Sequence, residues 1–379
     1  MSLKILCSGY LVRSPLGGLS WHHLQYLVGL QRLGHDVTFL EHFGWPDSCF
    51  DPSTGCMTSD PSYGIKHLNT LLEPFGLQDK WCYLAEDGMA HGMPRAQLER
   101  ICREADLYLN LSNINWIPEL EECRRRVLID TDPVFTQIGA HGIESAFDRY
   151  QVCFTYGENV HLTDCTMPTA GTTWRPTRQP IVLELWEPTA FGRAAGPFTT
   201  VANWRPFRSK SSEEGRYGQK DRQFKPYFRL PRETGYEMEL AMNPPDPARR
   251  LLIEGGWRVA DPSRVAGTPQ AYQQYLRDSR AEFSVAKHAY VSTQCGWFSE
   301  RTACYLASGV PVVVEDTGFP SWMETGIGVV PFRNRDEAAA ALDKITRSYG
   351  AHRQAAREIA SEYFEASRVL SKLLSDAVN

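Results

Sequence analysis

Residues 296–318 hold polar groups suited to binding a phosphate-bearing ligand, and the segment reads GWFSERTACYLASGVPVVVEDTG. Ser299 can cap a helix that starts at Glu300, and the free N–H groups of a first helical turn attract phosphate and hydroxyl oxygens. The apolar run before Asp316 predicts a buried strand that ends beside that turn. The alternative is a plain βαβ unit with a capped helix. The candidate ligand-binding residues here are Ser299, Glu300, Arg301, Asp316, Thr317 and Gly318.

A second candidate group is the N-terminal stretch GGLSWHH. Gly17 and Gly18 have no Cβ, so their backbone can approach a ligand closely. His22 or His23 could take a proton from an acceptor hydroxyl, since imidazole titrates near neutral pH. Successive helical residues point about 100° apart, so only one of the two rings is expected to face a site. A structural role is the alternative for each ring, and no partner at metal-ligand spacing accompanies the pair.

The third candidate group is the pair of carboxylates in the sequence DTDP. Asp130 ends the apolar run RVLI and Asp132 follows in the turn, where a carboxylate could orient an acceptor or act as its base. A turn capped by Asp side chains is the alternative. The spelling D-x-D also occurs in metal sites, but at the end of an N-terminal strand we interpret it as a coincidence. Residues 157–161, GENVH, follow another expected strand and form a weaker candidate of the same kind.

Alternating strands and helices must position these groups. Residues 4–9 are an apolar run ending at glycine, leucines recur at helical spacing up to Gly34, and 37–41 is a second apolar run. This β–loop–α–β order predicts a parallel, doubly wound sheet with ligands at the carboxyl ends of its strands. The alternation restarts after a stretch rich in Gly, Pro and Thr at 170–198, which we interpret as a domain boundary. Further strands are expected at 107–111, 126–130, 152–156, 198–203, 237–242, 257–259, 281–286, 311–315 and 328–331, and helices at 220–230 and 352–377.

The composition is that of a globular protein large enough for two domains, with 379 residues, 42% apolar and 22% charged. A net charge of -5 offers no general basic field, so we expect no nucleic acid partner and at most a peripheral membrane contact. The ten cysteines form no C-x-x-C pair, and the start MSLKILCSGYLV lacks a signal-peptide pattern. We therefore expect reduced, mostly buried thiols and a cytoplasmic location.

The segment 296–318 resembles the donor-binding region of glycosyltransferases with the two-domain GT-B architecture. In those enzymes a glycine-initiated loop, a helix and a strand reading G-x-P-V-V surround the nucleotide sugar. Residues 4–41 resemble their first βα unit, which implies that Gly17 and Gly18 face the donor phosphates or the acceptor.

The same resemblance assigns a role to the basic stretch after the first strand of the C-terminal half. It implies that Arg205 and Lys220 hold the diphosphate, whose negative charge grows as the sugar leaves. A solvated basic loop is the alternative. Arg208, Lys210 and Lys225 are competing cations in this stretch.

The chain departs from the pattern of many retaining members, which carry two glutamates separated by seven residues. The corresponding positions hold Gly296 and Cys304, and Glu300 is the only acid nearby. We expect Glu300 to hold the ribose hydroxyls from a different turn, with Asp316 or the backbone as alternatives. The stereochemical course is left open by this departure.

The resemblance implies an α/β protein of two Rossmann-like, doubly wound domains facing across a cleft. We expect an acceptor-side domain at 1–185, a donor-nucleotide domain at 186–350, and a C-terminal helix at 351–379 that packs back towards the first domain. The implied reaction moves a sugar from a nucleoside diphosphate sugar to an unidentified small-molecule, glycan or protein acceptor, without metal or cofactor. A nucleotide-sugar epimerase of the same fold and a non-catalytic nucleotide-binding protein are the alternatives. The missing G-x-G-x-x-G argues against an NAD enzyme.

Overall fold

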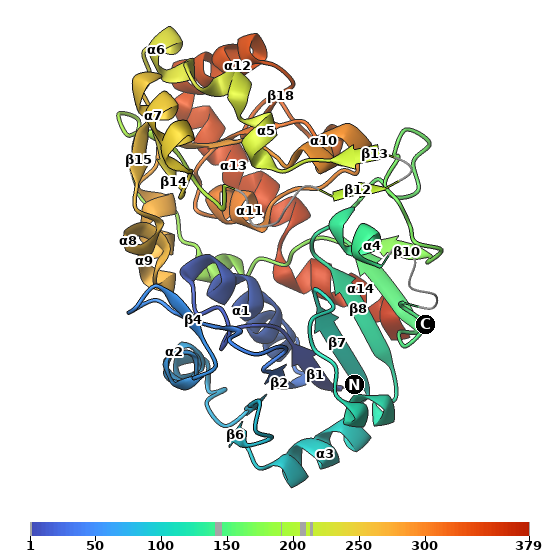
Figure 1. Ribbon diagram of the computed structural model, residues 1–379. Coiled ribbons are helices and arrows are strands. Elements are labelled where there is room, and N and C mark those ends of the chain that lie inside the picture. Colours follow the sequence, from blue (N-terminus) through green and yellow to red (C-terminus); the bar gives the residue numbers. More distant parts are fainter. Residues whose placement is uncertain (1, 141–145, 191, 205–209, 213–214, 379) are drawn as a thin grey trace.

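Two parallel sheets organise the molecule. The structure is a computed structural model that describes residues 2–140, 146–190, 192–204, 210–212 and 215–378 (Figure 1). Over these residues the N-terminal half forms an eight-stranded sheet in the order β10-β9-β8-β7-β1-β2-β5-β6, in which the β5–β6 pair alone is antiparallel. The strands are β1 (Lys4–Ser8), β2 (Asp36–His42), β5 (Trp81–Leu84), β6 (Ala90–Gly92), β7 (Leu107–Leu111), β8 (Arg126–Asp130), β9 (Val152–Thr155) and β10 (Trp174–Pro176).

The C-terminal half forms a second sheet of six strands among the described residues, in the order β15-β14-β11-β16-β17-β18, and every pair in it is parallel. Ranked along the chain, this order is 3-2-1-4-5-6, the Rossmann order, with its reversal between β11 and β16. A ligand is therefore expected at the carboxyl ends of those two strands. The strands are β11 (Phe198–Val201), β14 (Met238–Ala241), β15 (Arg258–Ala260), β16 (Ala281–Ser284), β17 (Val312–Glu315) and β18 (Val329–Phe332).

Helices cover the sheets, which explains the nearly continuous apolar runs of the strands. All five residues of β7 are buried, as expected for a parallel strand covered on both faces. The helices are α1 (Gly17–Arg32), α2 (Ser62–Leu72), α3 (Arg95–Glu104), α4 (Phe135–Gly139), α5 (Lys220–Gln223), α6 (Leu230–Thr234), α7 (Asp246–Glu254), α8 (Pro262–Ala266), α9 (Pro269–Arg277), α10 (His288–Thr293), α11 (Glu300–Ala307), α12 (Arg335–Arg347), α13 (Tyr349–Tyr363) and α14 (Ala366–Val378). Short 3-10 turns lie at Glu73–Phe75, Pro118–Glu122, Leu183–Leu185, Lys225–Tyr227 and Phe319–Ser321.

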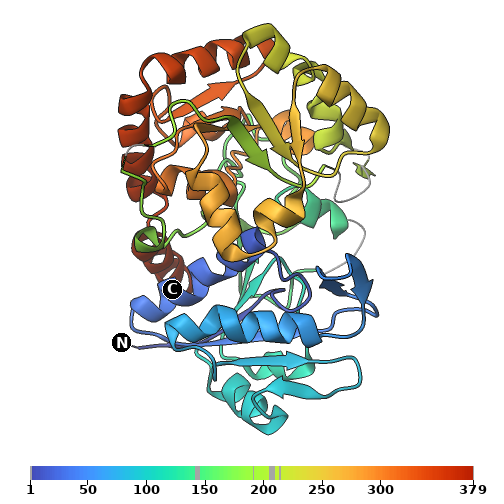
Figure 2. The same ribbon diagram turned by 90° about the vertical axis from the view of Figure 1, so that its left-hand side faces the viewer.

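The end of the chain returns to the N-terminal half (Figure 2). The single helix expected at 352–377 is two helices, because the chain pairs with residue 181 between them: Ile181 N–H donates to the Phe364 carbonyl at 2.7 Å and Ala366 N–H donates to the Ile181 carbonyl at 2.9 Å. α13 packs on α11, whereas α14 packs on α1. A Cβ on Gly29 would lie 2.5 Å from Leu370, so this glycine allows the close approach of α1 and α14.

One other expectation differs in detail. The helix expected at 220–230 is interrupted by the turn Lys225–Tyr227, since a proline at its second position cannot donate a helical hydrogen bond. Residues 42–66 contain the hairpin of β3 (Cys49–Asp51) and β4 (Cys56–Thr58) and the start of α2. In the C-terminal half, the small hairpin β12 (Lys210–Ser212) and β13 (Gly215–Tyr217) precedes α5.

Candidate functional site

An ion pair joins the carboxyl ends of the two sheets. Asp132, two residues beyond β8, accepts hydrogen bonds from the Lys287 ammonium at 2.8 and 2.7 Å. Lys287 follows β16, and the Tyr290 hydroxyl on α10 also donates to Asp132. The edges at which parallel sheets bind ligands therefore face each other.

Three cations gather at this edge of the C-terminal sheet. Lys220, at the start of α5, is 6% exposed and donates to the Val285 carbonyl just beyond β16. Burial, followed by the positive charges of Arg301 and Lys287, lowers the pKa of Lys220 to about 7. An anionic ligand beside it would restore its proton.

Arg301 connects two neighbouring strands from α11. Its guanidinium donates to Glu282 at 2.7 Å and to Ser284 at 2.8 Å, both on β16, and to the Val201 carbonyl at the end of β11 at 2.9 Å. Glu282 is fully buried. Arg301 thus lies at the topological switch point. It holds the ends of β11 and β16 together and places a positive charge beside them.

Glu300 faces the N-terminal half from the first turn of α11. Its carboxylate accepts a hydrogen bond from the Cys304 thiol at 3.0 Å. Burial raises its pKa to about 7. Its charge adds to burial in raising the pKa values of three tyrosines around it, Tyr10, Tyr156 and Tyr272.

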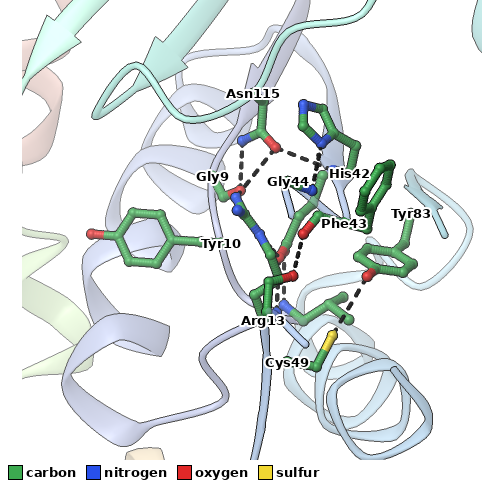
Figure 3. Close-up of polar contacts among 12 residues, drawn as sticks. Gly9, Tyr10, Arg13, His42, Phe43, Gly44, Cys49, Tyr83 and Asn115 are labelled. Carbon is green, nitrogen blue, oxygen red and sulfur yellow. Dashed lines mark hydrogen bonds and ion pairs between the residues drawn. The ribbon is translucent and has the colours of Figure 1, made fainter. Parts of the chain in front are cut away.

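A buried ion pair fixes the loop that carries Tyr10, and Figure 3 shows Tyr10 beside Arg13 and Asn115 of these polar contacts. Glu41, at the end of β2, accepts hydrogen bonds from the backbone of Val12 at 2.7 Å and from the backbone and guanidinium of Arg13 at 2.8 and 3.1 Å. Asn115 donates to the Gly9 carbonyl at 2.7 Å. Tyr10 points away from this cluster, and after burial the charges of Asp132 and Glu300 raise its pKa.

The two histidines of α1 differ in their hydrogen bonding. The Nδ1 of His23 lies 2.7 Å from the Leu19 carbonyl, which can only accept, so Nδ1 carries the proton and Nε2 accepts from Tyr10 N–H at 3.2 Å. Both nitrogens are occupied, and burial lowers the pKa of His23 to about 3. His22 is also buried, with a pKa lowered to about 4, but its Nε2 has no hydrogen-bond partner among the described residues. Of the two, His22 has the ring nitrogen that a hydroxyl could still use.

Gly17 and Gly18 lie where α1 meets α9. A Cβ on Gly17 would come within 2.3 Å of the Thr268 carbonyl oxygen, and one on Gly18 within 3.2 Å of the Tyr272 ring. Trp21 also donates to the Pro269 carbonyl at 2.8 Å. The structure therefore gives both glycines a role in packing the halves together, and their expected contact with the donor stays a prediction.

Asp130 is fully buried, and its carboxylate accepts four hydrogen bonds. Its carboxylate accepts hydrogen bonds from Thr136 at 2.6 Å, Gln137 at 2.8 Å, Thr155 at 2.7 Å and the Asp132 backbone at 3.0 Å. Burial raises its pKa nonetheless. With its lone pairs occupied, Asp130 supports the turn that carries Asp132, and this arrangement favours Asp132 as the group facing a substrate.

The glycines at both ends of segment 296–318 lie against Asn159 from the N-terminal half. A Cβ on Gly296 would lie 2.7 Å from the Asn159 side chain, and one on Gly318 would lie 2.6 Å from it. The Asn159 amide donates to the carbonyls of Gln294 and Gly318, each at 3.0 Å, and accepts from Ser321 at 2.7 Å. Asn159 belongs to the weaker candidate 157–161, and it joins the two halves.

The remaining donor candidates occupy different environments. Asp316 accepts from Gly318 N–H at 2.7 Å and from Arg333 at 2.9 Å, and the Thr317 hydroxyl donates to the Trp297 carbonyl at 2.5 Å, so both stabilise the turn after β17. Ser299 is buried ahead of α11 and makes no side-chain capping bond. Arg205 lies outside the described residues.

Sequence reasoning missed Lys287 and Tyr10, although one signal was present for Lys287. The chain reads AEFSVAKH after Arg280, which places a cation three residues beyond a buried strand. Tyr10 follows β1 in the same way but has no distinctive motif around it. Among the described residues, no three His, Cys, Asp or Glu side chains form a group that could hold a metal ion. No helix in the described ranges has the length and apolar character needed to span a bilayer.

No protein-family model matches the sequence, and no curated protein matches it. Solved structures do match. An alpha-glucosyltransferase in complex with UDP-glucose and DNA containing an abasic site has a TM-score of 0.62 at 10% identity, covering 100% of both chains. HepE from Anabaena in complex with UDP and glucose has a TM-score of 0.57 at 12% identity, covering 98% of this chain and 99% of that one. Sucrose-phosphate synthase from Thermosynechococcus elongatus has a TM-score of 0.54 at 13% identity, covering 98% of each chain.

These similarities establish the fold. The chain has the two Rossmann-like domains of GT-B glycosyltransferases along its whole length, as the resemblance implied. They also correct the expectation of no nucleic acid partner. Alpha-glucosyltransferases of this fold were solved with DNA, including DNA with a mismatch, an abasic site or an HMU base. The net charge of a chain averages over its surface, so a value of -5 does not exclude a local basic contact.

Proposed function

We propose that this chain transfers a sugar from a nucleoside diphosphate sugar to the hydroxyl group of an acceptor. The observation that carries the proposal is the cluster of Lys220, Lys287 and Arg301 at the switch point of the C-terminal sheet, opposite the carboxyl edge of the N-terminal sheet. Fixed positive charge at that place suits a diphosphate. The GT-B fold, shared over full length with structures that contain UDP, supports the same reading.

In the proposed reaction the bond between the anomeric carbon and the diphosphate oxygen breaks, and the acceptor oxygen forms a new bond to that carbon. The diphosphate leaves with the bonding electrons, and Lys220 and Arg301 stabilise its growing charge. The acceptor proton passes to a base of the N-terminal half. His22 and Asp132 are the candidates, since His23 and Asp130 have their lone pairs or protons engaged in the fold.

We assign Glu300 to the ribose hydroxyls of the donor. Its carboxylate has one hydrogen bond among the described residues, from Cys304, and so retains acceptor capacity. It lies at the start of α11 beside Arg301, so a ribose bound to it would place the diphosphate next to the cation cluster.

The reaction is proposed to need no metal, because side-chain cations can neutralise the leaving diphosphate. Turnover should survive EDTA and be unaffected by added Mg²⁺ or Mn²⁺. Stimulation by a divalent ion, lost in Asp130→Ala, would show instead that Asp130-Thr131-Asp132 is a metal site.

The direct test combines binding and turnover. Isothermal calorimetry with UDP and a panel of nucleotide sugars should show binding that Lys220→Met weakens by at least tenfold, since one lost charge-assisted contact is worth about 1.5–3 kcal/mol. Release of the nucleotide with transfer of the sugar supports a transferase. Isomerised nucleotide sugar without release would indicate an epimerase, and binding without either reaction a non-catalytic protein. No binding of any nucleotide would contradict the proposal.

Nucleic acid is a second candidate for the acceptor. The DNA complexes of the similar alpha-glucosyltransferases favour it. Four exposed cations follow Lys220 along the chain, and in the described part of the protein none pairs with a carboxylate: Arg222, Lys225, Arg229 and Arg232. Fluorescence anisotropy with duplex and single-stranded oligonucleotides over a salt series should give binding whose salt slope falls when Lys225→Glu and Arg229→Glu are combined. Unchanged binding in that variant, or none in the wild type, would leave glycans as the acceptors to screen.

A further inference from the structure

We propose that Lys287 is a third cation for the donor diphosphate and that Asp132 occupies it until the donor binds, so that the incoming diphosphate displaces Asp132. This inference rests on the proposed function. The pair of Lys287 and Asp132 then has two roles. Before the donor binds, Asp132 neutralises the charge of Lys287, and when the donor binds, the carboxylate of Asp132 is released on the acceptor side.

The geometry places Lys287 within the cation cluster. Lys220 donates to the carbonyl of Val285, two residues before Lys287, and the charge of Lys287 acts directly on Lys220. The Lys287 side chain is only 13% exposed, and its ammonium donates to both carboxylate oxygens of Asp132. A cation so placed would reach the same anion as Lys220, provided that Asp132 gives it up.

Charge balance indicates that one carboxylate must leave. Glu282 pairs with Arg301 and Asp132 pairs with Lys287, and the buried Glu315 acts on Lys220, so each of the three cations already has a carboxylate beside it. A diphosphate brings several negative charges into this buried region. Binding it while Glu282 and Asp132 both stay paired with their cations would be strongly unfavourable, because like charges in a buried site repel with little screening.

Asp132 is the carboxylate best able to leave. Glu282 and Glu315 are completely buried on the strands of the C-terminal sheet, and Glu315 also accepts the Ala286 N–H at 2.9 Å. Asp132 belongs to the other half, stands on a turn beyond its strand and is 30% exposed. Its displacement breaks no hydrogen bond within the C-terminal sheet.

Lys287 would stay in place after Asp132 leaves. Its ammonium lies 4.6 Å from the centre of the Phe135 ring and 5.2 Å from that of Tyr290, and such faces attract a cation. Phe135 comes from the N-terminal half and Tyr290 from the C-terminal half. The released Asp132 is then a free carboxylate on the acceptor side, which predicts that the donor binds before the acceptor.

The test is whether Asp132→Asn strengthens or weakens the binding of UDP. Asp132→Asn keeps an oxygen for Lys287 and Tyr290 but removes the charge, and it should tighten UDP binding by about three- to tenfold, as expected for freeing one charge-assisted contact. A merely structural ion pair predicts the opposite sign, because its loss would loosen the site. Lys287→Met should weaken UDP binding by about tenfold, and in the double variant Asp132→Asn should no longer have an effect.

The matched control is Asp36→Asn, which removes an exposed ion pair of the same length, 2.8 Å to Lys80, and should leave UDP affinity unchanged. Circular dichroism and Tm verify that each variant is folded. Equal or weaker UDP binding by Asp132→Asn, or an effect of Asp132→Asn that persists without Lys287, would overturn the inference while leaving the proposed function intact. Failure of the wild type to bind UDP or any other nucleotide would overturn the proposed function itself.

Discussion

The thiol of Cys304 donates a hydrogen bond to the carboxylate of Glu300 at 3.0 Å, one helical turn apart on α11. Counted back from Gly309, Cys304 has the position at which the resemblance to many retaining enzymes implies a glutamate. In this chain the nearest carboxylate, that of Glu300, lies one helical turn earlier and accepts the hydrogen bond of the Cys304 thiol. The carboxylate is thereby kept near the domain interface, within electrostatic reach of Tyr10 and Tyr156.

Glu300→Gln should flatten the pH dependence of stability. The folded pKa of Glu300 is raised from 4.5 to about 7, so the folded state holds its proton more tightly than the unfolded state. Its contribution is fully present below about pH 4.5 and is lost as the pH rises through about 7. Tm measured from pH 5 to 8 should therefore fall more steeply in the wild type than in Glu300→Gln. Parallel curves would show that Glu300 ionises as an exposed residue does.

Cys304→Ala is the companion variant. The thiol hydrogen bond lowers the pKa of Glu300 against the effect of burial. Its loss should move the stability transition to higher pH, whereas Cys304→Ser, which keeps a donor, should leave it near the wild-type position.

Lys220 should take up a proton when UDP binds. The pKa of Lys220 in the free protein is lowered to about 7, so most of it is neutral at pH 8, and a bound diphosphate favours the charged form. Calorimetry at pH 8 in buffers of different ionisation enthalpy should report uptake of about one proton, and affinity should fall as the pH rises above 7. Lys220→Arg stays charged and is the control: it should bind UDP without this uptake. Equal uptake by both proteins would assign the proton to another group.

His23→Ala should destabilise the protein, because it removes the acceptor for Tyr10 N–H and leaves a cavity beside Gly9. We expect a loss of about 2–4 kcal/mol in the free energy of unfolding, measured by urea denaturation. His22→Gln should cost less stability and should reduce turnover if His22 is the base. A His23→Ala protein of wild-type stability without turnover would instead make His23 the base.

Gly318→Ala should cost more stability than Gly326→Ala. Both glycines have φ near +100°, at 95° and 100°, so alanine is strained at both, by about 1–2 kcal/mol. Only at position 318 would the new methyl also lie 2.6 Å from the Asn159 amide, while at 326 the nearest atom is 3.6 Å away. The difference in unfolding free energy between the two variants measures the clash with Asn159 of the other half together with that on the Gln294 carbonyl oxygen, 2.8 Å away in the same half. Adding Asn159→Ala to Gly318→Ala should recover part of it, and no recovery would place the clash elsewhere.

Much of the architecture follows from local pattern. The apolar run at 107–111 is β7 to the residue, and the helix expected after Ser299 is α11. The sequence could predict these because a buried strand or a short helix is determined by neighbours a few positions away, although Ser299 does not form the capping bond that its type suggested. The helix expected at 352–377 failed because residue 181, far away in sequence, interrupts it.

In the candidate site, too, some features follow from the local sequence and others depend on contacts between distant residues. The resemblance to GT-B enzymes implied Lys220 as a ligand of the diphosphate, and the sequence of the segment showed Glu300 as its nearest acid; both assignments stay predictions. The glycines of that segment could be read as ligand contacts, yet the structure places Asn159 against both. Asp132 meets Lys287 across 155 residues, at the face where two separately formed sheets come together. The sequence alone determined the two sheets and the polar groups at their edges, and only the tertiary structure decided which of those groups meet, because the domain contacts depend on the relative orientation of halves that no local pattern encodes.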